Sequence, residues 1–510
     1  MRYALFCLSL LGLGLAGIIT QWMAVPCLLI LVQKPVMNWG ILAGLVLLPL
    51  ALTAEVEGDS IMYDVPLAMR TLAHHSLNFS LDNIVGLCIS GSDLILTIAP
   101  EHGRIISCLC FTACSIILWD MMDWAGAGRE KWLAPVFVLT AEGVLRLAAS
   151  SKYDSPMILF SFISAWYYQR NRFFSAGLAM GCACACKIQA VPLLVGMALF
   201  GGSLWRVVLG GAVLMVPWIA RQYLMMGHGL FPYMGSDFSE QFMPSIRRAQ
   251  YALTILKGRG LWNTVVYIWS FSPIVAVLLP FMRGRMALIG VFGGAGIWLL
   301  LENQSRYLLP CLPFLAIPAM KVLARSRPYF RMDAVGHDFH YQYLRAGTGR
   351  KRIRRLLAVY ATAASIALIP TYLKYLHQPP IPASYIEAMA ACEGKRVIGW
   401  GEERKYPGYN PANIMWSYSS LPMMWQISKE AASPERMRVR FRQMKVDHML
   451  INFPSLQTQG KYSGPFPWRG WQARRYYQFC RKYMVLEWQG TVFDGAGSYL
   501  LMGITKRKTR

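Results

Sequence analysis

The chain has 510 residues, of which 55% are hydrophobic and 15% charged, and its mean hydropathy is +0.35. This composition excludes a disordered chain and an ordinary soluble enzyme. The net charge is +25, and residues 321–355 and 374–510 together hold +20 of it. The rest of the chain is nearly neutral and strongly apolar. The pattern therefore predicts a multi-span membrane protein with one basic loop and one basic tail, and makes nucleic-acid binding a poor second interpretation.

Apolar segments bounded by charged or polar breaks follow one another along the first 373 residues. A membrane-spanning helix needs about 20 mostly apolar residues, and the sequence predicts about 11–13 such helices, several of them short. The first two segments can instead form one hairpin, or the first can be a signal-like segment. Residues 81–99 contain Asp82 and Asp93 and are expected to be interfacial or re-entrant. The predicted spans lie at 3–20, 21–33, 38–54, 105–120, 132–149, 157–169, 173–186, 188–204, 207–220, 262–282, 286–301, 306–322 and 356–373.

The positive charges predict the orientation of these spans. With the N-terminus inside, every inner loop carries Lys or Arg, as the positive-inside rule requires. This orientation predicts a transmembrane domain over residues 1–373, with its first outer loop at 55–104 and its basic cytoplasmic loop at 321–355. The tail, residues 374–510, is then on the outer side. In a bacterial envelope the membrane would be the inner membrane, and the first outer loop and the tail would be periplasmic.

The tail shows the alternation of a small α/β domain. Apolar runs at 396–400, 449–453, 484–486 and 499–502 are typical of strands. Ser433 followed by Pro434 and Glu435 predicts the start of a helix that runs to about 446. A second helix is expected over 471–483.

Cysteines and paired charges inside the spans have structural interpretations. Cys182, Cys184 and Cys186 alternate with alanine, and a small-residue helix that packs closely explains them better than a metal site. No metal site is predicted from these cysteines. A disulfide is possible in the tail, where Cys392 and Cys480 lie. Glu142 and Arg146 are four residues apart, so they can pair along one helix face.

Carboxylates crowd one membrane exit, at residues 55–64. Glu57, Asp59 and Asp64 are the candidates there, and the alternative is simply a solvated acidic loop. Three cations, Lys187, Arg221 and Arg306, end or begin spans on the same outer side, and together they can neutralise a phosphate at headgroup depth. Each cation alone is also typical of a snorkelling anchor.

In order and spacing, residues 55–320 resemble the GT-C membrane glycosyltransferases, in particular the bacterial enzymes similar to the aminoarabinose transferase of lipid A and the protein mannosyltransferases. The resemblance implies a polytopic α-helical GT-C-like fold. It also implies an enzyme that moves a sugar from a polyprenyl-phosphate donor to a lipid, glycan or protein acceptor at the periplasmic face, by direct displacement with inversion. The motifs that carry it are Glu57-Gly-Asp59, Tyr63-Asp64-Val65-Pro66, Asp154, Lys187, Arg221 with Phe231-Pro232, and Arg306-Tyr307-Leu308-Leu309-Pro310.

The resemblance also implies roles for individual residues. Asp59 would take the proton of the acceptor hydroxyl, with Glu57 orienting it or sharing a cation. Lys187, Arg221 and Arg306 would hold the leaving phosphate, on which charge builds as the glycosidic bond breaks. The remaining substrate-binding candidates are Tyr63, Tyr307 and Asp154. Asp154 would position the donor sugar or pair with a cation. No cofactor is required, and a divalent cation at Glu57 and Asp59 is optional.

The chain departs from the family pattern at Asp64, where relatives often have His, so Asp64 competes with Asp59 for the catalytic role. Two other functions stay open. A lipid-linked sugar flippase or other transporter would use the charges as a path, although transporters usually place polar groups near the midplane and show repeated halves. A non-catalytic assembly subunit would tolerate neutralisation of Asp59.

Overall fold

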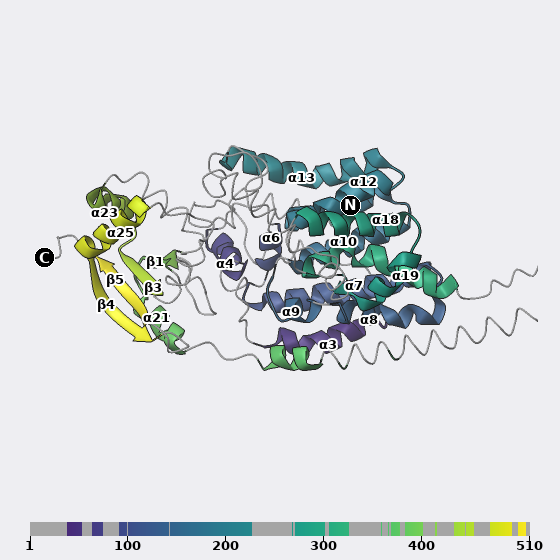
Figure 1. Cartoon of the computed structure of the whole chain (residues 1–510), viewed down its shortest axis with the longest axis horizontal. Helices are drawn as coiled ribbons and strands as arrows, with labels where there is room; N and C mark the ends of the chain where they lie inside the picture. The colour runs from purple at the N-terminus through teal and green to yellow at the C-terminus, as the bar shows by residue number, and fades with distance from the viewer. Residues whose placement is uncertain are drawn as a thin grey trace, which may run out of the picture.

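A computed structural model of the chain describes two regions, a helical one that precedes a mixed sheet (Figure 1). Isolated positions 268, 359, 366, 414 and 415 are also described. The continuous described ranges are 38–53, 64–74, 91–98, 100–141, 143–152, 154–226, 271–300, 305–325, 369–377, 383–400, 433–443, 445–452, 470–491 and 498–505.

The helical unit comprises the described residues up to 325, and its helices pack around one apolar core. Its α-helices are α3 (Ile41–Ala51), α4 (Val65–His74), α6 (Ser92–Leu96), α7 (Gly103–Trp124), α8 (Leu133–Leu139), α9 (Val144–Ala148), α10 (Asp154–Gln169), α11 (Phe173–Cys186), α12 (Val191–Phe200), α13 (Leu204–Met226), α17 (Pro273–Leu278), α18 (Arg285–Leu300) and α19 (Leu312–Arg325). Its 3₁₀ turns are η2 (Pro100–His102), η3 (Gly128–Trp132), η4 (Ile188–Ala190), η5 (Leu279–Phe281) and η6 (Ser305–Cys311).

Most predicted spans in the described part coincide with helices. By length and apolar composition, two of these helices can cross a membrane, Gly103–Trp124 and Leu204–Leu224. Shorter apolar helices cover Ile41–Ala51, Phe173–Cys186, Ile188–Phe200 and Arg285–Ile297. The first two predicted spans, at 3–20 and 21–33, lie outside the described residues. The number of membrane crossings therefore stays a prediction.

The predicted single span over 132–149 is wrong, because the chain there forms two short helices. Helix α8 ends at Leu139 and α9 begins at Val144. Between them Gly143 has φ +89°, a left-handed conformation that glycine adopts at little cost and that interrupts a helix. The single helix face on which Glu142 was expected to pair with Arg146 does not form, and Glu142 itself lies outside the described residues.

Small residues bring α11 and α13 close together, as the sequence of α11 predicted. A Cβ atom added at Gly177 would lie 2.3 Å from the Val207 carbonyl oxygen, and one added at Gly181 would lie 2.8 Å from that of Gly211. The contacts 177 with 207 and 181 with 211 advance in the same direction, so the two helices run parallel. Cys182, Cys184 and Cys186 are buried along the same helix, which accords with their predicted packing role.

The sheet unit, described residues 383–505, contains five strands in the order β2-β1-β3-β5-β4. β1 pairs in parallel with β2 and β3, whereas β5 pairs antiparallel with β3 and β4. The predicted strands and helices of the tail are present, and β2 and α21 are additional. The disulfide that the sequence left possible between Cys392 and Cys480 is not formed in the structure. The elements are α21 (Ala383–Ala391), β1 (Val397–Trp400), β2 (Ile414–Met415), α23 (Pro434–Gln443), β3 (His448–Asn452), α25 (Gly470–Tyr483), β4 (Met484–Thr491) and β5 (Ser498–Ile504).

Candidate active site

An ion pair with a buried carboxylate joins the first residue of α10 to the residue that follows α11. Lys187 Nζ lies 2.9 Å from Asp154 Oδ1 and donates a hydrogen bond to it. The Asp154 side chain is 1% exposed, whereas the Lys187 side chain is 21% exposed. The carboxylate is therefore sealed from solvent, while the lysine side chain is partly exposed.

Serine hydroxyls hold the start of α10 against α7. Ser107 Oγ donates to the Ser150 carbonyl at 2.8 Å, and Ser155 Oγ donates to Ser107 Oγ at 3.0 Å. Gly103 allows the close approach, because a Cβ atom there would lie 2.6 Å from the Ser151 side chain. These contacts fix the turn before Asp154, so the carboxylate has a defined position.

Lys187 is placed by the end of α11. Its backbone is extended, with φ −159° and ψ 127°, between α11 and the turn η4. Gly91, just before α6, donates its N–H to the Ala185 carbonyl at 2.6 Å. The segment that enters α6 thus closes over the last turn of α11, close to the lysine.

Arg306 and Tyr307 bring a third part of the chain to the pair. The Lys187 ammonium lies 4.8 Å from the centre of the Tyr307 ring, a cation–π distance. Arg306 Nη2 donates to Tyr307 Oη at 3.1 Å, and the Arg306 side chain is buried. The turn η6 that carries both residues passes close to Gly143, where an added Cβ atom would lie 2.9 Å from Arg306 Cβ. The break between α8 and α9 therefore makes room for Arg306.

The local charge at this cluster is positive. Arg306 and Lys152 both lie within electrostatic range of Asp154, in addition to Lys187. Lys152 is only 1% exposed. Three cations face one carboxylate among the described residues at this point, which favours binding of an additional anion.

Two more predicted site residues belong to the same end of the helical unit. Arg221 is buried near the end of α13, with its guanidinium 5.4 Å from the centre of the Trp218 ring. Trp218 also reaches Gly91, which contacts the end of α11. Asp64 is buried directly before α4, and α4 packs against α6. The predicted catalytic and substrate residues Glu57, Asp59 and Tyr63 lie outside the described residues.

Sequence reasoning overlooked two residues of this cluster. Lys152 lies two positions before Asp154, and a lysine this close to a candidate carboxylate was the signal that the sequence offered. Gly143 sits inside an apolar run, and nothing local in the sequence indicated that an arginine 163 positions later would pack against it. Among the described residues, no group of three or more His, Cys, Asp or Glu side chains could hold a metal ion.

The fold has a counterpart among solved structures. ArnT from Cupriavidus metallidurans bound to undecaprenyl phosphate superimposes with a TM-score of 0.51 and 13% sequence identity, over 92% of this chain and 98% of ArnT. The same ArnT in the apo state gives a TM-score of 0.46 and 12% identity, over 91% and 97% of the two chains. Neither a scan against protein-family models nor a search of curated sequences found a match.

The chain thus has an ArnT-like fold along nearly its whole length. The predicted similarity to the aminoarabinose transferase is confirmed at the level of the fold, which is like that of ArnT. The molecule is mostly helical with a small sheet, as expected. At 13% identity the similarity concerns the architecture and does not by itself transfer residue roles.

Proposed function

We propose that this chain is a membrane glycosyltransferase of GT-C type that transfers a sugar from a polyprenyl-phosphate carrier to an acceptor at the periplasmic face. The main observation in support is the positively charged cluster of Lys187, Arg306 and Lys152 around one sealed carboxylate. The ArnT-like fold adds to it, because that protein was solved with undecaprenyl phosphate bound. A phosphate on a lipid carrier is an anion that such a cluster would hold.

The proposed reaction forms one bond at the anomeric carbon and breaks one. The acceptor oxygen attacks the anomeric carbon and forms the new glycosidic bond while the bond between that carbon and the phosphate oxygen breaks. The electron pair of the broken bond stays on the phosphate, and the acceptor proton passes to a carboxylate. One displacement at the anomeric carbon gives inversion. Asp59 is the proposed base, with Glu57 beside it, and Asp64 is the competing candidate.

The cations act on the leaving group. A phosphodiester donor carries one negative charge, and the released phosphomonoester gains most of a second. Preorganised cations at that oxygen stabilise the transition state more than the ground state, typically by a factor of about 10²–10³ per donor group removed. Lys187, whose side chain is partly exposed, is proposed to contact the phosphate directly. Arg306 and Arg221 are proposed to complete the phosphate site, and Tyr307 to line it.

Of the two roles that the resemblance implies for Asp154, the pairing with a cation is the one proposed. Because its side chain is 1% exposed and contacts Lys187, it is proposed to position the lysine and not to touch the sugar. It also offsets part of the positive charge when no donor is bound. Without it the site would hold three like charges close together, which is costly in a low-dielectric environment.

The test measures transfer of radiolabelled sugar from the polyprenyl-phosphate pool of cell membranes to endogenous acceptors. Asp59→Asn, Asp64→Asn and Lys187→Ala are compared with wild type at equal membrane expression. Lys131→Ala is the matched control, because this lysine pairs with Asp123 at 2.6 Å in the turn after α7, away from the cluster.

Loss of transfer in Lys187→Ala and in one of the two aspartate variants, with accumulation of lipid-linked sugar, would support the proposal and identify the base. If all variants transfer as well as Lys131→Ala, the proposed site is wrong. Proteoliposomes that move an intact labelled donor across the bilayer without cleaving it would instead support a transporter.

A further inference from the structure

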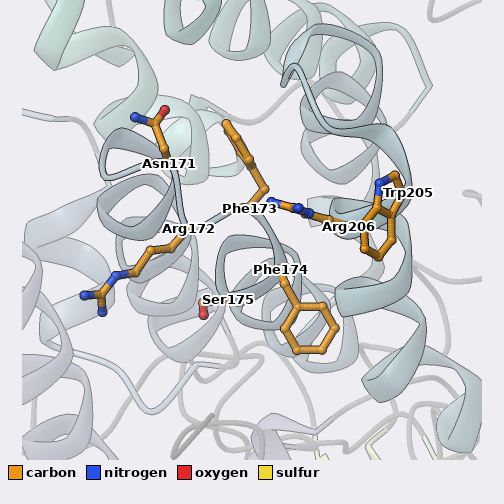
Figure 2. A pocket seen from close by; sticks show the side chains of 7 residues that line it. All are labelled: Asn171, Arg172, Phe173, Phe174, Ser175, Trp205 and Arg206. Carbon is orange, nitrogen blue, oxygen red and sulfur yellow. The ribbon is translucent and has the colours of Figure 1, made fainter.

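A second positively charged site lies at the other end of the same helices. A cavity of about 260 Å³ lies between the start of α11 and the start of α13 (Figure 2). Helix α10 has 16 residues and α11 has 14, so at about 1.5 Å per residue the cavity is some 20 Å from Lys187. The residues that line it are Asn171, Arg172, Phe173, Phe174, Ser175, Trp205 and Arg206.

The two arginines of the cavity differ from Arg170 and Lys131 at the same end. Arg170 pairs with Asp120 at 2.7 Å, and Lys131 pairs with Asp123. In the part of the chain that the structure describes, Arg172 and Arg206 form no salt bridge with a carboxylate, and both are exposed. Their charges are therefore available to an anion from outside the protein.

The backbone at the cavity adds donors for an anion. Asn171 has φ +57°, and this left-handed residue reverses the chain between α10 and α11. Helix α11 then starts at Phe173 with Arg172 at its N-cap, and no side chain caps it. The unsatisfied N–H groups and the helix dipole at such an end favour negative charge. The Ser175 hydroxyl, in the first turn, is a further donor at the cavity wall.

Apolar side chains surround the same cavity on the outer surface of the helices. Figure 2 shows Trp205, at the start of α13, beside Arg206, with Phe174 below them and Arg172 extending to the opposite side. Trp205 is 64% exposed, Leu204 58% and Phe174 40%. Val208 and Leu209 continue this exposed face along α13. A water-soluble phosphate would leave this surface uncovered, whereas the acyl chains of a lipid would cover it.

We infer that this cavity binds the headgroup of an anionic phospholipid, with the phosphate held by Arg206 and the start of α11, Arg172 adding positive charge at the rim, and the acyl chains lying along α13. The site is separate from the proposed transfer reaction, and it needs only that the helical unit lies in a membrane. Its place on the end that carries Arg170, Lys131 and Arg285 agrees with the side predicted to be cytoplasmic, where anionic lipid is abundant.

The test is native mass spectrometry of the full chain, purified in detergent and stripped of native lipid, during titration with dioleoylphosphatidylglycerol or dioleoylphosphatidylcholine. Wild type is compared with the double variant R172A/R206A. Arg283→Ala is the matched control, because Arg283 is exposed, precedes α18 and does not line the cavity. Inorganic phosphate at millimolar concentration is added as a competitor.

Wild type and Arg283→Ala are expected to bind phosphatidylglycerol about tenfold more tightly than phosphatidylcholine, and the double variant is expected to lose this preference. The inference is overturned if the double variant keeps the preference, or if wild type shows none. Displacement of the lipid by inorganic phosphate, but not by sodium chloride of equal ionic strength, would show a free-anion site and would also overturn it. Wild type alone provides a second measurement, since its preference should weaken as salt is raised.

Discussion

The contact between Asp154 and Lys187 allows stability and catalysis to be separated by a double-mutant cycle. Asp154→Asn leaves the cations Lys187, Arg306 and Lys152 without the carboxylate at their centre, and Lys187→Met leaves that carboxylate buried without its nearest partner. Breaking a buried ion pair on one side typically costs about 3–5 kcal/mol. The Lys187 side chain is partly exposed, and Arg306 and Lys152 partly compensate for the loss of one charge. Each single variant is therefore expected to lose about 3 kcal/mol of unfolding free energy, the lower limit of this range.

The double variant Asp154→Asn with Lys187→Met removes both charges. Contacting residues are typically coupled by up to about 3 kcal/mol, so the double variant should recover about 2 kcal/mol of the summed loss. Unfolding is followed in mixed micelles as the fraction of denaturing detergent is raised. Sugar transfer is measured on the same preparations.

Unfolding and sugar transfer should respond differently to the double substitution. The loss of stability in the double variant should be about 4 kcal/mol, smaller than the summed loss of about 6 kcal/mol from the two single variants. Its transfer should be about 100-fold or more below wild type and no lower than in Lys187→Met alone, because the cation on the leaving phosphate is missing in both. Lys187→Arg should retain part of the transfer. Restored transfer in the double variant would show that the pair is only structural, and zero coupling would show that the pair does not form.

Three other predictions concern the rest of the chain. Gly143→Ala places a side chain on a residue with φ +89° and against Arg306. The free energy of unfolding should therefore fall by about 1–3 kcal/mol, and sugar transfer should fall with it. Gly126→Ala is the control, because Gly126 also has a positive φ but has open space around it. In the sheet unit, burial raises the pKa of Asp447, but hydrogen bonds from His448 and Arg396 outweigh it, so this pKa lies below its ordinary value. The stability that this carboxylate adds is present above about pH 4 and is lost as the pH falls further. Limited proteolysis should therefore release the sheet unit more readily below that pH. In Asp447→Asn the rate of release should depend less steeply on pH. A fluorescent protein that matures only in the cytoplasm, fused after the last residue, should stay dark if the tail is periplasmic, and bright cells would refute the predicted orientation.

Local sequence patterns were sufficient for much of the fold. Apolar runs of helical length predicted most of the helices in the described part, because a buried or lipid-facing helix must be apolar around most of its surface. Short apolar strands and a Ser-Pro-Glu helix start likewise predicted the sheet and α23 of the tail. Alternating small residues in α11 indicated a close helix contact, which is the one with α13. The strand β2, only two residues long, carries too little pattern to be recognised.

The geometry of the site depended on tertiary structure. The sequence singled out Asp154, Lys187 and Arg306 one by one, from polar residues at span ends. Their assembly required α10, α11 and η6 to pack at one end of the helical unit, and packing among distant segments is not encoded in any local period. Likewise, Gly143 became a conformational requirement only once Arg306 was placed against it. Packing also gave the two side chains of the pair different exposures. Helices α7 and α10 bury the Asp154 side chain, whereas the Lys187 side chain, at the end of α11, stays partly exposed.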